Sequence, residues 1–139
     1  MGIFADTQTF RTIMVDLFDQ VCQGNAAETQ SLHKSKMIVS FNCSDPGLRI
    51  TIDGRKAPLM VSFDDKRLRP DLEAELSADT LHYILTGELR LGKAMSSGQM
   101  KVRGAVWKAM TLEDVLHACQ AKYPVIVTKY RLDGYARPS

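Results

Sequence analysis

The chain has little excess charge of either sign and few aromatic residues. Its 139 residues include 18 Lys and Arg against 16 Asp and Glu, giving a formal net charge of +2, and only 7% are Phe, Trp or Tyr. Phosphate backbones and anionic bilayers attract strongly basic proteins, and base stacking requires aromatic side chains interleaved with Lys or Arg along a strand. Neither pattern is present, so the sequence argues against a nucleic-acid-binding protein.

Cysteine is scarce, and no hydrophobic run is long. Cys22, Cys43 and Cys119 are odd in number, share no C-x-x-C spacing and lie in apolar patterns, which suits reduced core thiols better than disulfides or a zinc site. The first ten residues lack a basic segment followed by an apolar stretch, and no apolar run approaches the ~18 residues that cross a bilayer. We therefore expect a soluble, cytoplasmic protein with at most peripheral membrane contact.

Length and composition predict one ordinary globular domain. A chain of this size buries roughly 68–70% of its unfolded surface, and 45% hydrophobic with 24% charged residues falls in the globular range. No internal repeat and no linker rich in Ser, Gly or Pro divides the sequence. We expect a single domain over residues 1–139, with a core at about 36–116, an N-terminal helix at 6–24 and a C-terminal tail at 124–139.

The sequence predicts three helices before the last strand, two of them from apolar residues at helical spacing. The clearest covers residues 6–24, with Asp6 or Thr7 as its N-cap. A short polar helix is expected at about 26–33. A third, short and amphipathic, is expected at 77–87, between a capping Ser and a terminating Gly.

The C-terminal part of the sequence leaves alternatives open. Apolar spacing predicts a helix from Val106 to about Tyr123, where Pro124 intervenes. Because the residues that follow Met110 resemble a capping box, a new helix beginning at Thr111 is the alternative. The β-branched tail predicts an edge strand, with a lid or an arm reaching a second subunit as the other readings.

Alternating apolar residues predict five strands. Three of them, at about 37–44, 48–53 and 59–63, favour an antiparallel meander joined by tight turns. The strand at 71–76 is acidic on one side and the strand at 99–103 is basic, so these two are expected to pair. The pattern predicts an α+β fold with a single five-stranded, mainly antiparallel sheet, helices packed on one face in two layers, and water on the other face.

The stretch GELRLGKAMSSG, residues 87–98, has the glycine spacing of a phosphate-binding loop. Such a loop leaves a buried strand and opens a helix, and a Ser or Thr follows its Lys. Here the stretch follows a predicted helix, Ala94 occupies the hydroxyl position, and Leu89 and Leu91 place apolar bulk in the cradle. The sequence therefore argues against nucleotide binding.

The same stretch resembles the lipid-binding domain of the sterol carrier protein type 2 family. In that family a helix ends in Gly and is followed by a Lys-Ala turn, a strand between two glycines, and an amphipathic helix. The matching residues here are Leu81, Leu85, Gly87, Lys93, Ala94, Gly98, Met100, Lys101, Val102, Gly104, Ala109, Met110 and Leu112. The resemblance covers about 36–116 and is strongest from Asp71 onward, while Trp107 is bulkier than the residue usual in the family.

The resemblance implies a carrier whose helices and sheet enclose an apolar tunnel for a sterol, a fatty acyl chain or another lipid. Seven methionines suit such a cavity, because a flexible thioether adapts to ligands of variable shape, although methionine also fills core gaps without a ligand. The predicted lining is Leu17, Phe18, Phe41, Leu85, Met95, Met100, Val102, Trp107, Met110 and Leu116, with Gln99 at the rim.

Few residues suit catalysis or metal binding. His117 and Cys119 are two apart on a predicted helix and do not face each other, while Glu113 and His117 suit an exposed ion pair. The carboxylates of the strand at 71–76 would balance the basic strand rather than hold a metal. We predict no catalytic residue, no metal and no cofactor.

Together these patterns predict non-enzymatic binding or transfer of a lipid or other hydrophobic ligand, of fatty acyl, sterol-like or isoprenoid type. The alternative is an accessory or scaffold protein whose apolar groove receives a partner helix or mediates homodimerisation. An enzyme acting on lipids would need a nucleophile and a base that the sequence does not bring together.

Overall fold

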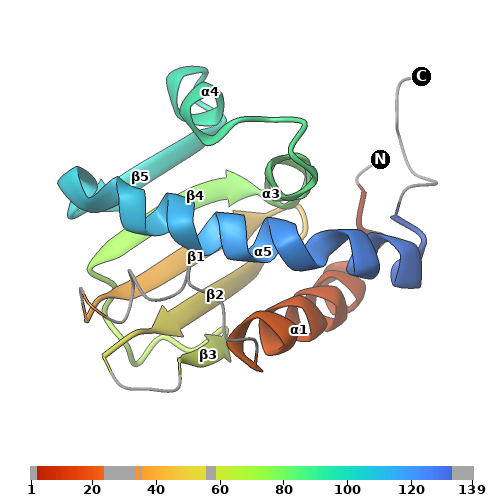
Figure 1. Ribbon diagram of the computed structural model, residues 1–139, viewed down its shortest axis with the longest axis horizontal. Coiled ribbons are helices and arrows are strands. Elements are labelled where there is room, and N and C mark those ends of the chain that lie inside the picture. The colour runs from red at the N-terminus through yellow and green to blue at the C-terminus, as the bar shows by residue number, and fades with distance from the viewer. Residues whose placement is uncertain (1–2, 24–33, 35, 56–58, 133–139) are drawn as a thin grey trace.

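The computed structural model describes residues 3–23, 34, 36–55 and 59–132 (Figure 1). Its elements are α1 (Thr7–Gln23), β1 (Ile38–Ser44), β2 (Leu48–Asp53), β3 (Met60–Phe63), β4 (Leu72–Ser77), α3 (Ala78–Thr86), α4 (Leu91–Ser96), β5 (Met100–Gly104), the 3-10 turn η2 (Val106–Lys108) and α5 (Ala109–Tyr130). The short helix expected at 26–33 lies outside the described residues.

The strands form one sheet in the order β3-β2-β1-β4-β5. β1, β2 and β3 are the expected antiparallel meander, β4 runs parallel to β1, and β5 runs antiparallel to β4. The acidic and basic strands pair as predicted, with Glu75 opposite Lys101 and an ion pair of 3.2 Å between Arg103 and Glu75. The predicted α+β class and mainly antiparallel sheet are confirmed.

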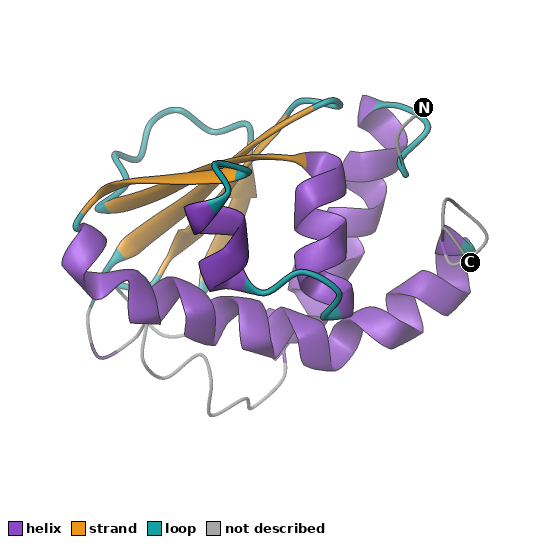
Figure 2. Cartoon of the chain, turned by 90° about the horizontal axis from the view of Figure 1, so that it is seen from above, coloured by secondary structure: helices purple, strands orange, loops and turns teal. Residues whose placement is uncertain are grey.

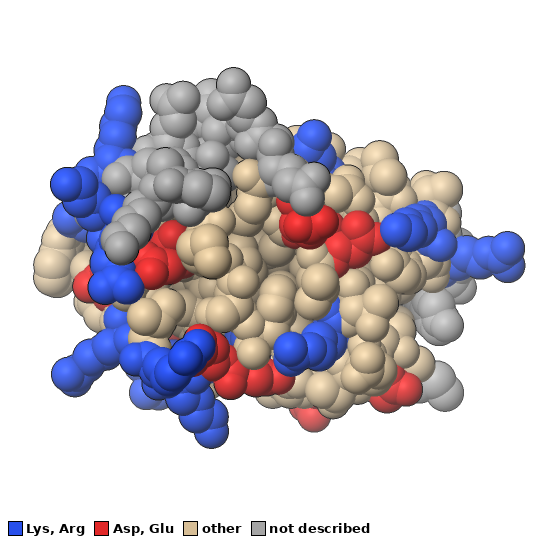
Figure 3. Space-filling model, turned by 90° about the horizontal axis from the view of Figure 1, so that it is seen from below, with Lys and Arg blue, Asp and Glu red and all other residues tan. Residues whose placement is uncertain are grey.

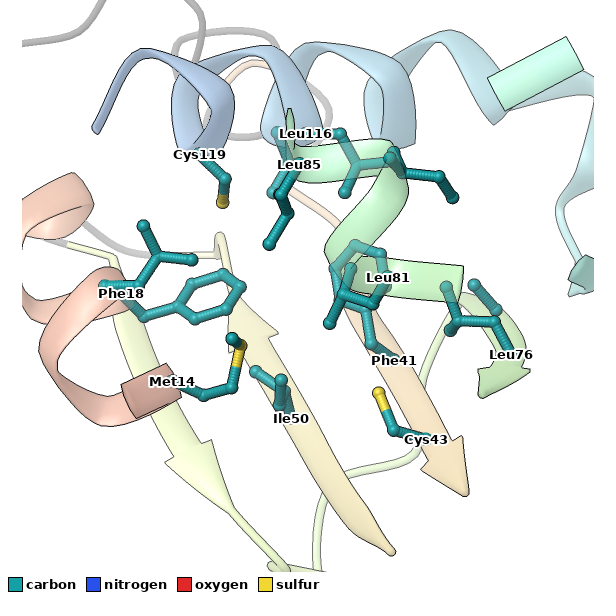
Figure 4. Close-up of a cluster of buried hydrophobic side chains, with 14 of the residues drawn as sticks. Met14, Phe18, Phe41, Cys43, Ile50, Leu76, Leu81, Leu85, Leu116 and Cys119 are labelled. Atoms are coloured by element: carbon teal, nitrogen blue, oxygen red, sulfur yellow. The ribbon is translucent and has the colours of Figure 1, made fainter. Parts of the chain in front are cut away.

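The helices lie on one side of the sheet (Figure 2). Apolar side chains of α1 and α3 pack against the inward-facing residues of the strands, and α5 crosses both helices on the side away from the sheet. The resulting core draws residues from every layer, including Phe18 of α1, Phe41 of β1, Leu85 of α3 and Cys119 of α5 (Figure 4). The apolar periodicities of the sequence therefore meet in one interior.

The other face of the sheet, which was expected to meet water, is partly shielded from solvent. Ser40 of β1 and Thr51 of β2 point away from the helices, yet both are fully buried. β3 lies at the edge and β4 lies beyond β1, so the connection at 64–71 has to cross the two strands between them; Figure 2 shows a loop on this face. Its ends are held by backbone bonds of 2.8 Å, from Asp64 to Arg49 and from Asp71 to Ile38.

Side-chain and glycine caps fix the helix ends that the sequence predicted. Asp6 Oδ1 accepts a hydrogen bond of 2.7 Å from the Thr9 N–H at the start of α1, and this bond lowers the pKa of Asp6. Ser77 Oγ accepts a hydrogen bond of 3.0 Å from the Thr80 N–H at the start of α3. Gly87 ends α3 in the left-handed region at φ 84°.

The edge strand expected after Pro124 is wrong, because α5 continues through Pro124 to Tyr130. Proline removes one helical hydrogen bond, but the apolar face continues past it and buries Ile126. Asp16 of α1 also holds the end of α5, at 2.6 Å from Lys129 Nζ and 2.8 Å from Tyr130 Oη. Tertiary contacts therefore outweigh the lost backbone bond. Residues 133–139 of the predicted tail lie outside the described residues.

Two local details also differ from the expectations. The Lys-Ala turn lies within the short helix α4, and α5 begins at Ala109, directly after η2. Thr111 therefore lies inside α5 rather than at the start of a new helix. No helix of the described residues combines the length and the apolarity needed to cross a membrane.

Candidate functional site

The structure separates the predicted site residues into a core set and a surface set. Six are buried in the core, namely Leu17, Phe18, Phe41, Leu85, Met100 and Leu116, and Val102 is half-buried against them. The other four, Met95, Gln99, Trp107 and Met110, lie on the surface. Figure 4 shows Phe18, Phe41, Leu85 and Leu116 within one packed cluster between the sheet and α5.

A first hollow lies between α5 and the segment from the end of α3 to α4. Its volume is about 520 Å³, within the range of pockets that hold one small ligand. Its lining is apolar at Ile84, Leu89, Leu91 and Leu116 and polar at Arg90, Lys93, Glu113, His117 and Gln120, with Gly87 and Gly92 completing the wall. An apolar surface bordered by charges suits an amphiphile.

A second hollow continues along the same side of α5. Its volume is about 560 Å³, and it is lined by Leu85, Thr86, Gly87, Gln120, Tyr123, Pro124, Val127 and Thr128. Gly87 and Gln120 belong to both hollows, which therefore adjoin. We call the two hollows together the α5 groove. Leu85 and Leu116 are the predicted site residues that line it.

The end of α3 shapes the groove where the two hollows meet. Gly87 ends α3 in the left-handed region, and its N–H donates to the Ile84 carbonyl at 3.1 Å. The same carbonyl accepts a bond of 2.8 Å from Gln120 Nε2. Gln120 therefore bridges from α5 to the end of α3 at the boundary of the hollows.

Pro124 lines the second hollow and lies inside α5. In an α-helix the N–H at this position would donate to the carbonyl four residues earlier, which belongs to Gln120. Because proline has no N–H, it cannot make that hydrogen bond.

The rim of the first hollow carries more positive than negative groups. Arg90 and Lys93 stand on the α4 side, and the described residues include no ion pair to either cation. On the α5 side, Glu113 lies 3.8 Å from His117, one helical turn away, as the sequence predicted. An anionic head group is therefore the best electrostatic match for this rim.

A buried polar pair supports the wall of the second hollow. His82 Nδ1 lies 2.7 Å from Tyr123 Oη, and both side chains are buried. Burial raises the pKa of Tyr123 well above its usual value, so the phenol stays neutral and remains able to donate. The pair fixes the Tyr123 ring, whose neighbour Pro124 lines the same hollow.

The groups considered for catalysis do not converge. Cys119 is buried in the core, and burial raises the pKa of its thiol, whereas His117 is exposed. On the acidic strand Glu73 pairs with Arg49 at 2.9 Å. Within the described part of the chain, no three His, Cys, Asp or Glu side chains are placed to hold a metal.

Comparison with known proteins gives the family. The sequence matches the SCP-2 sterol transfer family over residues 18–117, which is most of the chain. The chain belongs to this family. The matched range adds residues 18–35, which include the end of α1, to the region where the sequence showed the resemblance. The chain is therefore an SCP2-like lipid-binding domain.

Solved structures agree with the SCP2 fold. A sterol carrier protein 2 from Yarrowia lipolytica in its apo form is 20% identical, with a TM-score of 0.61 over 77% of this chain and 89% of that one. The sterol carrier protein domain 2 of Helicoverpa armigera is 18% identical, with a TM-score of 0.64 over 84% and 91%. A UbiJ-SCP2 ubiquinone synthesis protein is 12% identical, with a TM-score of 0.59 over 81% and 89%. No curated protein matches the chain.

Sequence reasoning missed most of the residues that line the α5 groove in this SCP2 domain. Val127 lies beyond Tyr123, where the sequence predicts that the helix ends before Pro124, and Gln120 lies on the last turn of that predicted helix. The available signal was the apolar spacing of Leu116, Tyr123 and Ile126, which continues in helical register through the proline.

Proposed function

We propose that this SCP2 domain binds and transfers an amphiphilic lipid, without catalysing a reaction, by holding its apolar chain in the α5 groove. The observation that carries the proposal is the position of the groove, where apolar walls from α3 and α5 adjoin the cations Arg90 and Lys93. Family membership supports a lipid as the ligand. The core set of predicted site residues would support the groove from behind, with Leu85 and Leu116 in direct contact with the ligand.

The geometry favours a chain with a small anionic head, such as a fatty acid. Each methylene moved out of water contributes about 0.8 kcal/mol before the costs of association. The head group would lie at Arg90 and Lys93, where a carboxylate gains charge-assisted hydrogen bonds. The chain would run past Gln120 toward Val127, where the walls are mostly apolar.

Titration with a fluorescent fatty acid and a fluorescent sterol tests the proposal. We expect saturable binding of the fatty acid, and Val127→Gln should weaken it by about tenfold because a polar amide enters the apolar wall. Val125→Gln is the matched control, since Val125 lies on the same helix, is exposed and does not line the groove. No saturable binding of any apolar ligand, or equal loss in both variants, would contradict the proposal.

The accessory or scaffold alternative uses the same groove for a partner helix or for a second copy. A structure similar to this one belongs to a ubiquinone synthesis protein, so an isoprenoid quinone should be included in the titration.

Mass spectrometry of organic extracts from the purified protein separates the carrier function from the scaffold function. A bound lipid supports the carrier, whereas a fixed protein partner without lipid supports the scaffold.

A further inference from the structure

An apolar cluster stands exposed at the end of the molecule where β5 leads into α5. Trp107, Met110 and Val106 are 78%, 68% and 49% exposed, although all three are large and apolar. Trp107 is the only tryptophan of the chain, and Met110 follows it by one helical turn. Grouped exposure of large apolar side chains marks an interaction site more often than an ordinary surface.

The backbone beneath this apolar cluster is fixed rather than loose. The Ala105 N–H donates to the Asp71 carbonyl at 2.9 Å, and the Lys108 N–H donates to the Ala105 carbonyl at 2.8 Å. Gly104, which precedes the turn, has a positive φ of 92°. It also lies so close to the start of β4 that an added Cβ would clash with the Asp71 carbonyl oxygen. The cluster is therefore displayed by a turn that is hydrogen-bonded to the sheet.

Two basic residues lie beside the apolar cluster. Lys36 and Lys108 line a hollow of about 240 Å³ together with Trp107. The carboxylate in that hollow belongs to Asp71, whose Oδ2 already accepts the Ile38 N–H at 2.8 Å. Figure 3 views the molecule from the side of β3, which lies at the opposite edge of the sheet from β5, and there Lys and Arg are mixed with Asp and Glu. On the side of β5, two lysines stand beside the exposed tryptophan.

We propose that this end docks on a lipid bilayer that contains anionic lipids. Val106, Trp107 and Met110 enter the interfacial layer, and Lys36 and Lys108 contact the head-group phosphates. Tryptophan favours this layer because its ring is apolar while its N–H finds a polar partner there. Lysines next to the cluster add attraction to a negatively charged surface.

Two features of the apolar cluster favour a bilayer over a protein partner. The cluster projects from the surface, whereas a helix-binding site is a groove that accepts a helix. Two copies meeting through this end would bring Lys36 and Lys108 of both copies together, which like-charge repulsion disfavours. An anionic bilayer, in contrast, complements both the apolar and the charged side chains.

Docking at this end is independent of whether the α5 groove holds a lipid. If it does, the two sites are connected through α5, because the lining of the first hollow begins at Glu113, one turn after Met110. Docking would then bring the near end of the groove toward the membrane. This last step alone rests on the proposed function.

The single tryptophan makes the docking directly measurable in the unmodified chain. We would titrate the protein with vesicles of phosphatidylcholine alone and with vesicles in which about a third of the lipid is phosphatidylglycerol. With anionic vesicles the Trp107 emission should shift to shorter wavelength and become protected from acrylamide. High salt should reverse most of this change, because it screens the lysines. Unchanged emission with anionic vesicles would overturn the proposal.

Variants measured by co-sedimentation with the same vesicles locate the surface. Trp107→Ala with Met110→Ser, and separately Lys36→Glu with Lys108→Glu, should each lower the partition coefficient by about tenfold or more. Met60→Ser with Val125→Ser is the control, since it removes exposed apolar side chains elsewhere and should leave the partition unchanged. Circular dichroism verifies folding of each variant. Binding that survives the first pair, or a stable dimer formed through this end without vesicle binding, would contradict docking.

Discussion

Gln120 is the side chain at which the two hollows of the α5 groove meet. Its amide donates to the Ile84 carbonyl, so it crosses from α5 to the end of α3 instead of pointing into solvent. The proposed ligand chain passes this side chain on its way from the first hollow to the second. Gln120 would therefore act as a constriction that limits how far a long chain reaches into the second hollow.

Removal of this constriction should change the preference for chain length. Gln120→Ala is expected to shift binding toward longer acyl chains, and to lower the free energy of unfolding by about 1 kcal/mol through loss of one hydrogen bond. The measurement is competition between a short and a long fatty acid, with chemical denaturation for stability.

Gln120→Met separates volume from hydrogen bonding. Methionine fills the same space without donating to Ile84, so stability should fall as in the alanine variant while chain-length preference stays as in the unmodified protein. An equal change of preference in both variants would show that the bond, and not the volume, controls the length of the ligand.

At the residue scale, burial was predictable for apolar residues on regular helix and strand faces, but not for those around η2. Leu17, Phe18 and Phe41 lie on regular apolar faces of α1 and β1, and the structure buries all three. Around η2 several apolar residues follow one another closely, so spacing alone does not decide which of them face inward. The structure leaves Trp107 and Met110 outside, and only the neighbouring strands and α5 could decide this.

At the scale of elements, the junction of β4, β5 and η2 depends on one glycine. Gly104 combines a left-handed φ with a close approach to the Asp71 carbonyl, and a side chain would have to overcome both. Gly104→Ala should lower the free energy of unfolding by about 2 kcal/mol or more, as measured by urea denaturation. It should also weaken vesicle binding, because η2 would move.

Gly92→Ala is the matched control for this substitution. Gly92 lies within α4, has no atom within 4 Å of an added Cβ, and does not have a positive φ. Alanine there should leave stability unchanged or raise it slightly through helix propensity. A Gly104→Ala variant as stable as Gly92→Ala would contradict the described turn.

The elements themselves were predictable where local signals agreed, and not elsewhere. The caps Asp6 and Ser77 predicted the starts of α1 and α3, and the alternating apolar residues predicted the five strands. The path of α5 through Pro124 did not follow from local rules, because the contacts of Asp16 with Lys129 and Tyr130 join residues far apart in sequence. The burial of Ser40 and Thr51 likewise depends on strand order, which periodicity does not specify.

At the scale of the whole molecule, the two proposals assign separate roles to the core, the groove and the docking end. We expect the core between sheet and helices to give stability, the α5 groove to hold the lipid, and the end that carries Trp107 to meet the bilayer. The groove and the docking end lie along the same helix, α5. A lipid in the groove would therefore have a short path to the membrane, and its entry would not require the core to open.

The most direct test of this arrangement is methyl NMR of the protein as a fatty acid is added. We expect saturable shifts at Leu89, Leu91 and Val127, which line the α5 groove, and little change at Ile50 and Leu17 in the core. The largest shifts at the core methyls, or none at the groove, would contradict the account.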